Sequence, residues 1–389
     1  IPTWGLWELR DSALLTASSD RARMSSACLE SAPAVVCASA SWQREGFATL
    51  DATLEDFEGD RLIGPDRAGW SLSGRASGTV SAELAPDRSL VAEGDLALSD
   101  GQLGYPSRTG ARAAQHQDTE FAFEVDGDGA RTAFRSVVTE ASGGAANLLG
   151  ELDFPGFQPL IDSIPSQAVQ GSVRASVVNL GALDALLQDV DSIGGDLSVD
   201  VTVSGTIGQP GLVGDARLTE GHANVPQLGL QLREIELTAQ GRGLDGVEVT
   251  GRLRSGTGVL TVSGDLPTIP SDDTPAVLQL TGSRIEAVDL PEVEVWVSPD
   301  LEVTLTPDAI RVEGEIGVPV ARVELSEIPA SAVRPSRDVV FVDDTSSVAQ
   351  RARTVRLNVR TTLGDSVSFQ GFGFSAKPRG SVLATCLLY

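Results

Sequence analysis

The stretch GGDLSVDVTVSGTIG, residues 194–208, decides which fold this chain can adopt. From position 197 to position 204, Leu or Val occupies every odd position and Ser, Asp or Thr every even one. Successive side chains of a β-strand point to opposite faces, so this alternation predicts a strand with one apolar and one polar face. The apolar face must then contact either another layer of protein or a ligand.

The same alternation recurs along most of the 389 residues. Examples are SGTVSAEL at 77–84, EFAFEV at 120–125 and GVLTVSGDL at 258–266. Gly, Asp, Asn or Pro separates most of these stretches, which is typical of turns between strands. Strands and helices do not alternate as they do in a parallel α/β fold. The sequence therefore predicts an all-β protein.

One helix is predicted near 180–191, because Leu or Val at positions 183, 186, 187 and 190 forms one apolar stripe. Asn179 suits the helix start, and Gly194 with Gly195 suits its end. A shorter helix or turn is predicted in GFQPLIDSIP, residues 156–165.

An internal repeat is visible in the sequence. EGDLALSDGQLGYP begins at Glu93 and VGDARLTEGHANVP at Val213, so that Gly94 aligns with Gly214 and Gly101 with Gly221, 120 positions apart (214 − 94). Downstream, Gly150 aligns with Gly264. Copies of such an all-β unit are expected to stack and to share one continuous apolar surface.

Two architectures can cover one-sided apolar strands. The sheet can pack on a second sheet as a sandwich, or it can curl so that the apolar face lines a trough. Glycine within strands marks bulges and bends and favours curling. The glycines in question are Gly241, Gly243, Gly251, Gly256 and Gly258. The residues alone leave both architectures open.

The apolar strand faces are the candidate binding site. A trough of this kind would be a wall for acyl chains, at about 0.8 kcal/mol for each buried methylene, whereas a sandwich would use the same residues as a closed core. The candidate residues are Leu197, Val199, Val201, Val203, Ile235, Leu237, Val247, Val249, Leu260, Val262, Leu278, Leu280, Val293, Val295, Val303, Leu305, Ile310, Val312 and Ile316.

Charge and motifs argue against other functions. The formal net charge of −25 disfavours nucleic acid and anionic membrane surfaces as partners. His116 and His222 have no nucleophile beside them in sequence, and DGDG at 126–129 lacks the later ligands of a calcium loop. GRGLDG at 241–246 precedes no helix start, so both glycine motifs predict hairpin turns. We expect no enzyme activity, no cofactor and no metal.

Cys28 and Cys37 are nine positions apart with Pro33 between them. A hairpin could bring them within disulfide distance in an oxidising compartment, and two free buried thiols are the alternative. Cys386 is left over in SVLATCLLY, which loses the strand-and-turn rhythm and is typical of a truncated end. The chain begins at Ile1, which indicates a piece of a longer protein, and it contains no apolar run of about 20 residues.

Several stretches resemble the TamB family. GDARLTEGHANVPQLGLQLREIELTAQGRG at 214–243 is similar to a segment of that family. VSPDLEVTLTPDAIRVEGEIGVPVARVELSEIPASAVRPSRDVVFVD at 297–343 resembles the start of its C-terminal domain, and TTLGDSVSFQGFGFSAKPRGS at 361–381 continues the pattern. With the repeat, the resemblance predicts a β region at 1–75, a first repeat at 76–170, a second at 171–290 and a truncated C-terminal domain at 291–389.

The resemblance implies an elongated, curved antiparallel sheet with an apolar groove, a β-taco, and one or two short helices. It implies phospholipid transport between the inner and outer membranes, assistance to outer-membrane protein assembly, and a TamA-like Omp85 barrel as partner. The implied location is the periplasm of a Gram-negative bacterium, with an inner-membrane anchor in the full-length protein. A scaffold that assists barrel or autotransporter assembly by β-augmentation, without lipid, is the alternative. Sparse tryptophan weighs against a carbohydrate-binding adhesin.

Overall fold

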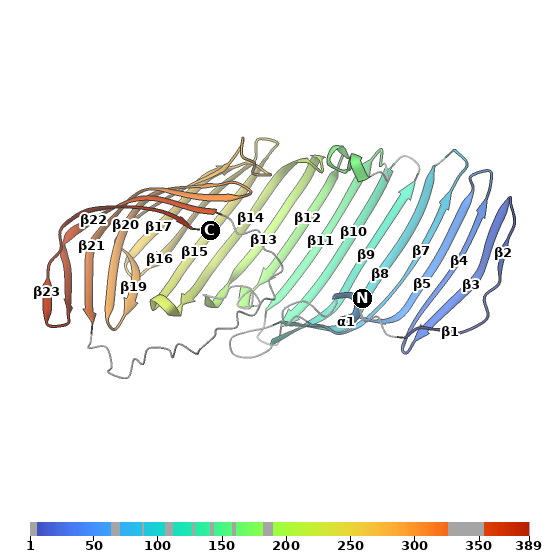
Figure 1. Cartoon of the computed structure of the whole chain (residues 1–389), viewed down its shortest axis with the longest axis horizontal. Helices are drawn as coiled ribbons and strands as arrows, with labels where there is room; N and C mark the ends of the chain where they lie inside the picture. The colour runs from blue at the N-terminus through green and yellow to red at the C-terminus, as the bar shows by residue number, and fades with distance from the viewer. Residues whose placement is uncertain are drawn as a thin grey trace, which may run out of the picture. The chain divides into compact units, whose positions relative to one another are not determined.

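The computed structural model describes residues 6–63, 71–87, 89–105, 112–126, 129–140, 144–157, 161–181, 190–325 and 354–388. The described residues are mostly β-strand, as Figure 1 shows. The chain divides into two compact units, which are described one at a time. Unit 1 comprises Ile1–Gln188, Ile193–Leu218 and Gln240–Asp245, and unit 2 comprises Asp189–Ser192, Thr219–Ala239 and Gly246–Tyr389.

Unit 1 is an open antiparallel sheet in which strands that follow one another in the chain are mostly neighbours. β1 and β2 both pair with β3, and β6 pairs with β8 beside β7. Its elements are β1 (Glu8–Leu9), β2 (Leu15–Ala17), β3 (Arg21–Ser31), β4 (Ala34–Gln43), β5 (Ala48–Glu58), α1 (Asp60–Ile63), β6 (Ser71–Leu72), β7 (Arg75–Leu84), β8 (Leu90–Tyr105), β9 (Arg112–Asp126), β10 (Gly129–Glu140), β11 (Ala145–Pro155), the 3₁₀ helix η1 (Ile161–Ser166), β12 (Gln170–Val178) and β13 (Asp191–Thr206).

Unit 2 is also a sheet of mostly antiparallel strands. β18 and β19 both pair with β20, and β21 pairs with β22 in parallel. Its strands are β16 (Val247–Ser255), β17 (Gly258–Leu266), β18 (Ala276–Ser283), β19 (Ile285–Leu290), β20 (Val293–Leu305), β21 (Ala309–Leu325), β22 (Thr354–Gly371), β23 (Phe374–Ala376) and β24 (Gly380–Leu388). Both units contain residues of β14 (Gln209–Val225) and β15 (Leu230–Gly243), which the 3₁₀ helix η3 (Pro226–Leu228) joins. The first two residues of β13, Asp191 and Ser192, also belong to unit 2.

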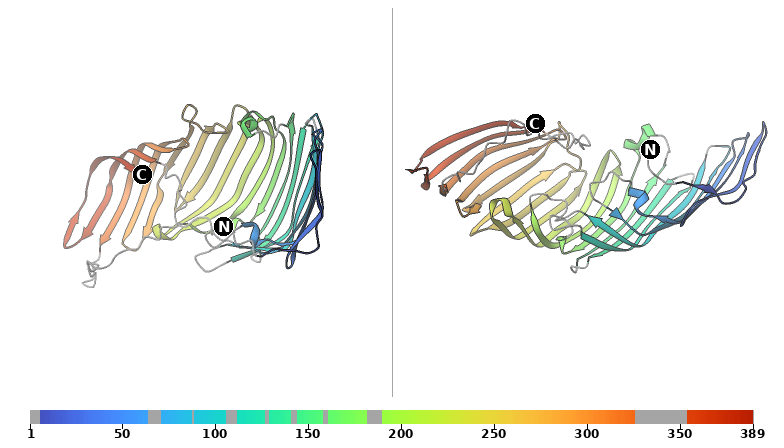
Figure 2. Two further views of the ribbon diagram at one scale, coloured as in Figure 1. Left: turned by 45° about the vertical axis from the view of Figure 1, so that its right-hand side comes forward. Right: turned by 60° about the horizontal axis from the view of Figure 1, so that its bottom comes forward.

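The strands of each unit form one curved layer, as Figure 2 shows. The curved antiparallel sheet is confirmed, and the sandwich that the residues alone left open does not form. In the described part of the chain, buried apolar side chains gather only in small clusters. One comprises Ala34, Phe57, Ala76 and Leu98, and the other Val318, Ala321 and Val367. Most apolar side chains of the strands lie outside these clusters.

The repeat seen in the sequence has a backbone counterpart. Asp100 in β8 and Glu220 in β14 occupy equivalent positions of the two copies. Both adopt the left-handed conformation, with φ of 49° and 54°, which residues with a side chain seldom adopt. The same uncommon conformation at equivalent positions supports the sequence alignment of the two copies.

The smaller sequence predictions have mixed outcomes. The helix or turn predicted at 156–165 overlaps η1 (Ile161–Ser166), whereas the helix predicted near 180–191 falls largely on 182–189, outside the described residues. The terminal stretch SVLATCLLY is not an irregular end: its residues up to Leu388 belong to β24, which pairs with β22. Both faces of this stretch carry apolar residues, so alternation could not reveal the strand.

The predicted turns and glycine bends can also be compared with the backbone. Asp126 pairs with Gly129 at the end of the β9–β10 hairpin, and residues 244–246 lie between β15 and β16. Gly256 lies in the β16–β17 turn, and Gly243 and Gly258 lie at strand ends. These three glycines therefore serve turns, and the expectation that they bend strand interiors is wrong.

The structure joins Cys28 to Cys37 in a disulfide. The two residues lie directly opposite each other on β3 and β4, with their Cα atoms 4.0 Å apart. They alternate along their strands with Leu29 and Val36, so the disulfide lies on the face opposite those side chains. It links the two strands of a hairpin near the N-terminal edge of unit 1.

Candidate functional site

One face of unit 1 carries an uninterrupted line of apolar residues, which we call the central row. Its members are cross-strand neighbours on β1, β3, β4, β5 and β7 to β13. They are Leu9, Leu29, Val36, Leu54, Gly78, Leu96, Phe121, Phe134, Gly150, Val173 and Val201. Since each is in register with the next, the row crosses the sheet without a polar side chain.

The four candidate residues of β13 lie on this apolar face. Leu197, Val199, Val201 and Val203 are opposite Val177, Ala175, Val173 and Gly171 of β12. They are half-buried, whereas the polar residues between them, such as Asp200 and Thr202, are exposed. The structure therefore gives β13 the orientation that its alternation predicts.

Unit 2 has matching rows. One row follows Gly251, Val262, Leu280, Leu301, Gly314, Val359 and Ala384, and the next follows Val249, Gly264, Leu278, Val303, Val312, Leu357 and Cys386. Val247 faces Leu266 and Leu253 faces Leu260, while Leu305 pairs with Ala276 and Ile310. The structure thus brings the candidate residues of β16, β17, β18 and the adjoining parts of β20 and β21 onto one face.

The other candidates of unit 2 lie in different surroundings. Ile316 and Val295 pack against the buried cluster around Val318, so they belong to a small closed core. Val293 lies on the same face of β20 as Val295 and pairs with Val323 of β21. In β15, Leu237 lies over Gly251, and Ile235 lies close to Gly221.

Large apolar side chains lie close to glycines of the neighbouring strand. A Cβ built on Gly150 would lie 2.2 Å from Cζ of Phe134, and one on Gly94 would lie 2.5 Å from Cε1 of Phe123. In unit 2, a Cβ built on Gly264 would lie 2.9 Å from Cδ2 of Leu278, and one on Gly251 would lie 2.3 Å from Cδ2 of Leu237. A ring or isobutyl group placed in this way covers the peptide group of the glycine with apolar atoms.

The apolar face of unit 1 remains accessible. Phe121 in the central row has a relative exposure of 40%, and Leu96 and Leu148 are similarly exposed. Monomeric proteins seldom expose large contiguous apolar surfaces unless these bind something. Polar side chains on this face include Thr132 and the neighbouring pair Thr119 and Ser136, whose hydroxyl groups form a hydrogen bond of 2.6 Å.

The opposite face of both units is charged. Cross-strand pairs include Arg131 with Asp153 in unit 1 and Arg252 with Glu236 in unit 2. The hydrogen bond and charge of Asp153 raise the pKa of Arg131, and Glu236 raises the pKa of Arg252. Both arginines are exposed, so these pairs contribute little stability and make a solvated outer wall.

The hollows of unit 1 are open to solvent and are lined by both polar and apolar residues. A hollow of about 620 Å³ in unit 1 lies between polar side chains that include Asp51, Glu93, Asp95 and Arg131. Val80 and Phe123 also line this hollow, but it is wide open to solvent. The apolar faces form open surfaces, where a long flexible chain can lie along many residues without being enclosed.

Sequence reasoning missed most of the apolar face of unit 1. The candidate residues began at Leu197, although the apolar face of unit 1 extends back to Leu9. The signal was present in SGTVSAEL and EFAFEV, whose apolar residues alternate in the same way. The glycines under Phe134 and Phe123 could not be identified, because alternation does not show which residue faces which across the sheet.

The described residues offer little for chemistry. They contain no group of three or more His, Cys, Asp or Glu side chains placed to hold a metal ion. His222 lies 3.4 Å from the carbonyl oxygen of Glu220 through its Nδ1, and the side chain of His116 lies outside the described set.

An open, repeat-built β-sheet with one accessible apolar face defines a groove-forming protein of the β-taco kind. Family comparisons agree with this class: the TamB C-terminal domain model matches residues 248–383, and the TamB N-terminal domain model matches residues 3–218. The chain belongs to the TamB family. No solved structure matches it. None of the described helices has the length and apolar character needed to cross a membrane.

Membership of this family supports a general role in outer-membrane protein assembly and lipid transport. TamB-family proteins are non-enzymatic cell-envelope proteins that span the periplasm. The match to the C-terminal domain begins at residue 248.

Proposed function

We propose that the apolar faces of units 1 and 2 hold phospholipid acyl chains during transport between the inner and outer membranes. The central row carries this proposal, because it offers a continuous, partly exposed apolar path from β1 to β13 of unit 1. Each methylene that leaves water contributes about 0.8 kcal/mol, so an open wall can retain a chain without any polar recognition.

Family membership supports an inference about the cellular setting. We infer that the chain works in the periplasm of a Gram-negative bacterium, as part of a protein anchored in the inner membrane. Its disulfide suits that oxidising compartment. We also infer that a TamA-like Omp85 barrel is the partner and that the protein supports outer-membrane protein assembly.

Site-specific photo-crosslinking in living cells tests this function. A photoreactive amino acid at Val249 would project from the apolar face, and one at the neighbouring Thr250 would project from the polar face. We expect phospholipid adducts at position 249 and not at position 250. Adducts with a nascent barrel protein and none with lipid would instead favour an assembly scaffold. Equal lipid adducts at both positions would contradict the groove.

A further inference from the structure

The two margins of the apolar face of unit 1 differ. At one margin Phe57 and Ala76 are 3% and 0% exposed, because Trp7 and Leu72 pack against them. The ring of Trp7 stacks on Phe57 with centroids 6.2 Å apart and planes inclined by 17°. This margin is sealed by the chain itself.

Polar contacts hold the sealing elements in place. Arg61 of α1 makes an ion pair of 2.8 Å with Glu58 and donates a hydrogen bond of 3.2 Å to Oγ of Ser31. The N–H of Ser73, next to β6, donates to the carbonyl oxygen of Gln102, and the N–H of Gln102 donates to Oγ of Ser73, both at 2.9 Å. Both ends of the α1–β6 segment are therefore attached to the sheet.

The other margin is open. Its last apolar row comprises Ala22, Trp42, Ala48, Leu84 and Leu90. Trp42 is 45% exposed and Leu84 is 38% exposed, although both are large apolar residues. Tryptophan favours places where an apolar region meets water, since its ring is apolar and its N–H is polar.

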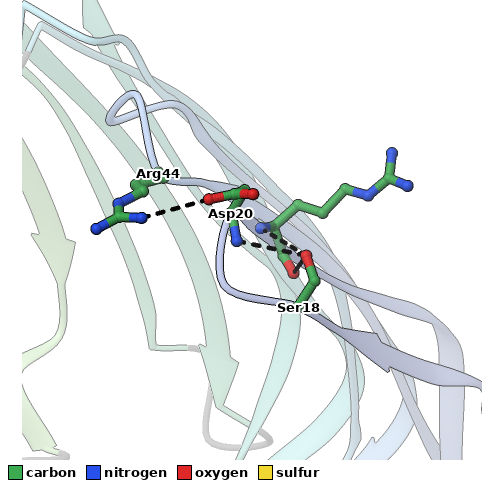
Figure 3. A network of polar contacts seen from close by, with 4 residues as sticks. Ser18, Asp20 and Arg44 are labelled. Carbon is green, nitrogen blue, oxygen red and sulfur yellow. Dashed lines mark hydrogen bonds and ion pairs between the residues drawn. The ribbon is translucent and has the colours of Figure 1, made fainter.

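Ionic groups lie just beyond Trp42. Figure 3 shows the turn before β3, where Oγ of Ser18 accepts hydrogen bonds from the N–H groups of Asp20 and Arg21. Arg44, two residues after Trp42, makes an exposed ion pair of 3.4 Å with Asp20, and its N–H donates to the carbonyl oxygen of Asp20. Charges of both signs thus border the open margin and suit a phosphate-bearing, zwitterionic headgroup.

The distance between the margins suits an acyl chain. Along β4, Trp42 and Ala34 are eight residues apart, which is roughly 26 Å at about 3.3 Å per residue. One leaflet of a bilayer is about 15 Å thick in its hydrocarbon part. A chain of that length that begins at Trp42 therefore ends about 11 Å before the sealed margin.

We propose that lipid lies along the strands of unit 1 with its headgroup at the Trp42 margin and its chain ends toward Trp7 and Phe57. Trp42 is then a positioning residue at the boundary between chain and headgroup, and the Trp7 cluster is the closed end. This orientation rests on the proposed function, since it requires that lipid occupies the apolar face.

Tryptophan quenching by spin-labelled phosphatidylcholine tests the orientation. The full chain is prepared in versions that keep only Trp42, only Trp7 or only Trp296, with every other tryptophan replaced by Phe. Trp296 is the control, because it lies on the face of β20 opposite the apolar residues Val295 and Val297. There it contacts the charged side chains of Glu294 and Arg284. If one of these versions fails to fold, Trp42→Phe and Trp7→Phe are made singly in the otherwise unchanged chain. The decrease in quenched fluorescence that each substitution causes then reports the quenching of the tryptophan it removes.

A headgroup nitroxide should quench Trp42 at least twofold more than Trp7, and a nitroxide near the chain end should do the reverse. Trp296 should respond to neither. A reversed or equal pattern would overturn the orientation while leaving lipid binding intact. No quenching of Trp42 or Trp7 by either lipid would overturn both the orientation and the proposed function of unit 1.

Discussion

Val201→Glu places a carboxylate among the apolar side chains of β13. Val201 ends the central row beside Val173 and lies between Val199 and Val203 along β13. A carboxylate at the centre of a hydrocarbon layer costs about 2.5–3.5 kcal/mol. At 1.36 kcal/mol for each factor of ten, a chain that covers this position should bind roughly 70- to 400-fold more weakly.

The fold should tolerate this change. Val201 is only half-buried, so losing its contacts should cost about 1 kcal/mol of unfolding free energy. Thr202→Glu is the matched control, because it adds the same charge one residue away on the exposed polar face. Titration with a fluorescent phospholipid measures affinity, and thermal unfolding measures stability.

The reasoning would be refuted if folded Val201→Glu bound lipid as tightly as the unchanged chain. It would also be refuted if Thr202→Glu weakened binding equally, because the effect would then come from net charge and not from the face.

Four further outcomes are expected. Replacing both Cys28 and Cys37 by Ser should lower the unfolding free energy of unit 1 by about 2.5 kcal/mol, the value expected for a loop of this length, and no change in chemical denaturation would contradict a structural role. Gly150→Val should force the ring of Phe134 away and cost about 1–3 kcal/mol, whereas Gly150→Val with Phe134→Ala should recover part of that loss in the same assay. Burial, followed by nearby carboxylates, raises the pKa of Glu286, so ionisation of this group should weaken folding as the pH rises above the ordinary glutamate pKa. Glu286→Gln should therefore raise the melting temperature at pH 7 and not at pH 4. An equal gain at both pH values would exclude ionisation as the cause. The net charge of −25 should make melting temperature rise between 10 mM and 300 mM NaCl, and a fall would show that self-repulsion is not a major term.

Much of the fold could be predicted because most strands have one apolar and one polar face. The odd positions of 197–203 are on one face of β13 as their alternation indicates, and the residues of β16 and β17 behave in the same way. The matching left-handed conformations of Asp100 and Glu220 could not be predicted, but the sequence repeat located both.

Cross-strand arrangement could not be predicted from the chain alone. The position of Phe134 over Gly150 depends on register, which a one-residue shift would reverse. The parallel pairing of β21 with β22 and the strand β24 were missed for related reasons. Local alternation specifies faces, whereas pairing depends on turns and on contacts between residues distant in sequence.

The packing of Trp7 on Phe57 was also beyond sequence reasoning. These residues are far apart in the chain, and the segment that contains Trp7 has only short strands. Nothing in its composition distinguishes a residue that seals an apolar face from one that lies on the surface.

The central claim is that the apolar faces bind acyl chains, and native mass spectrometry of the purified chain with identification of extracted lipids tests it most directly. The account predicts bound phospholipid that is lost in Val201→Glu and retained in Thr202→Glu. A folded, monomeric chain that carries no lipid and takes up none from added phospholipid would contradict it.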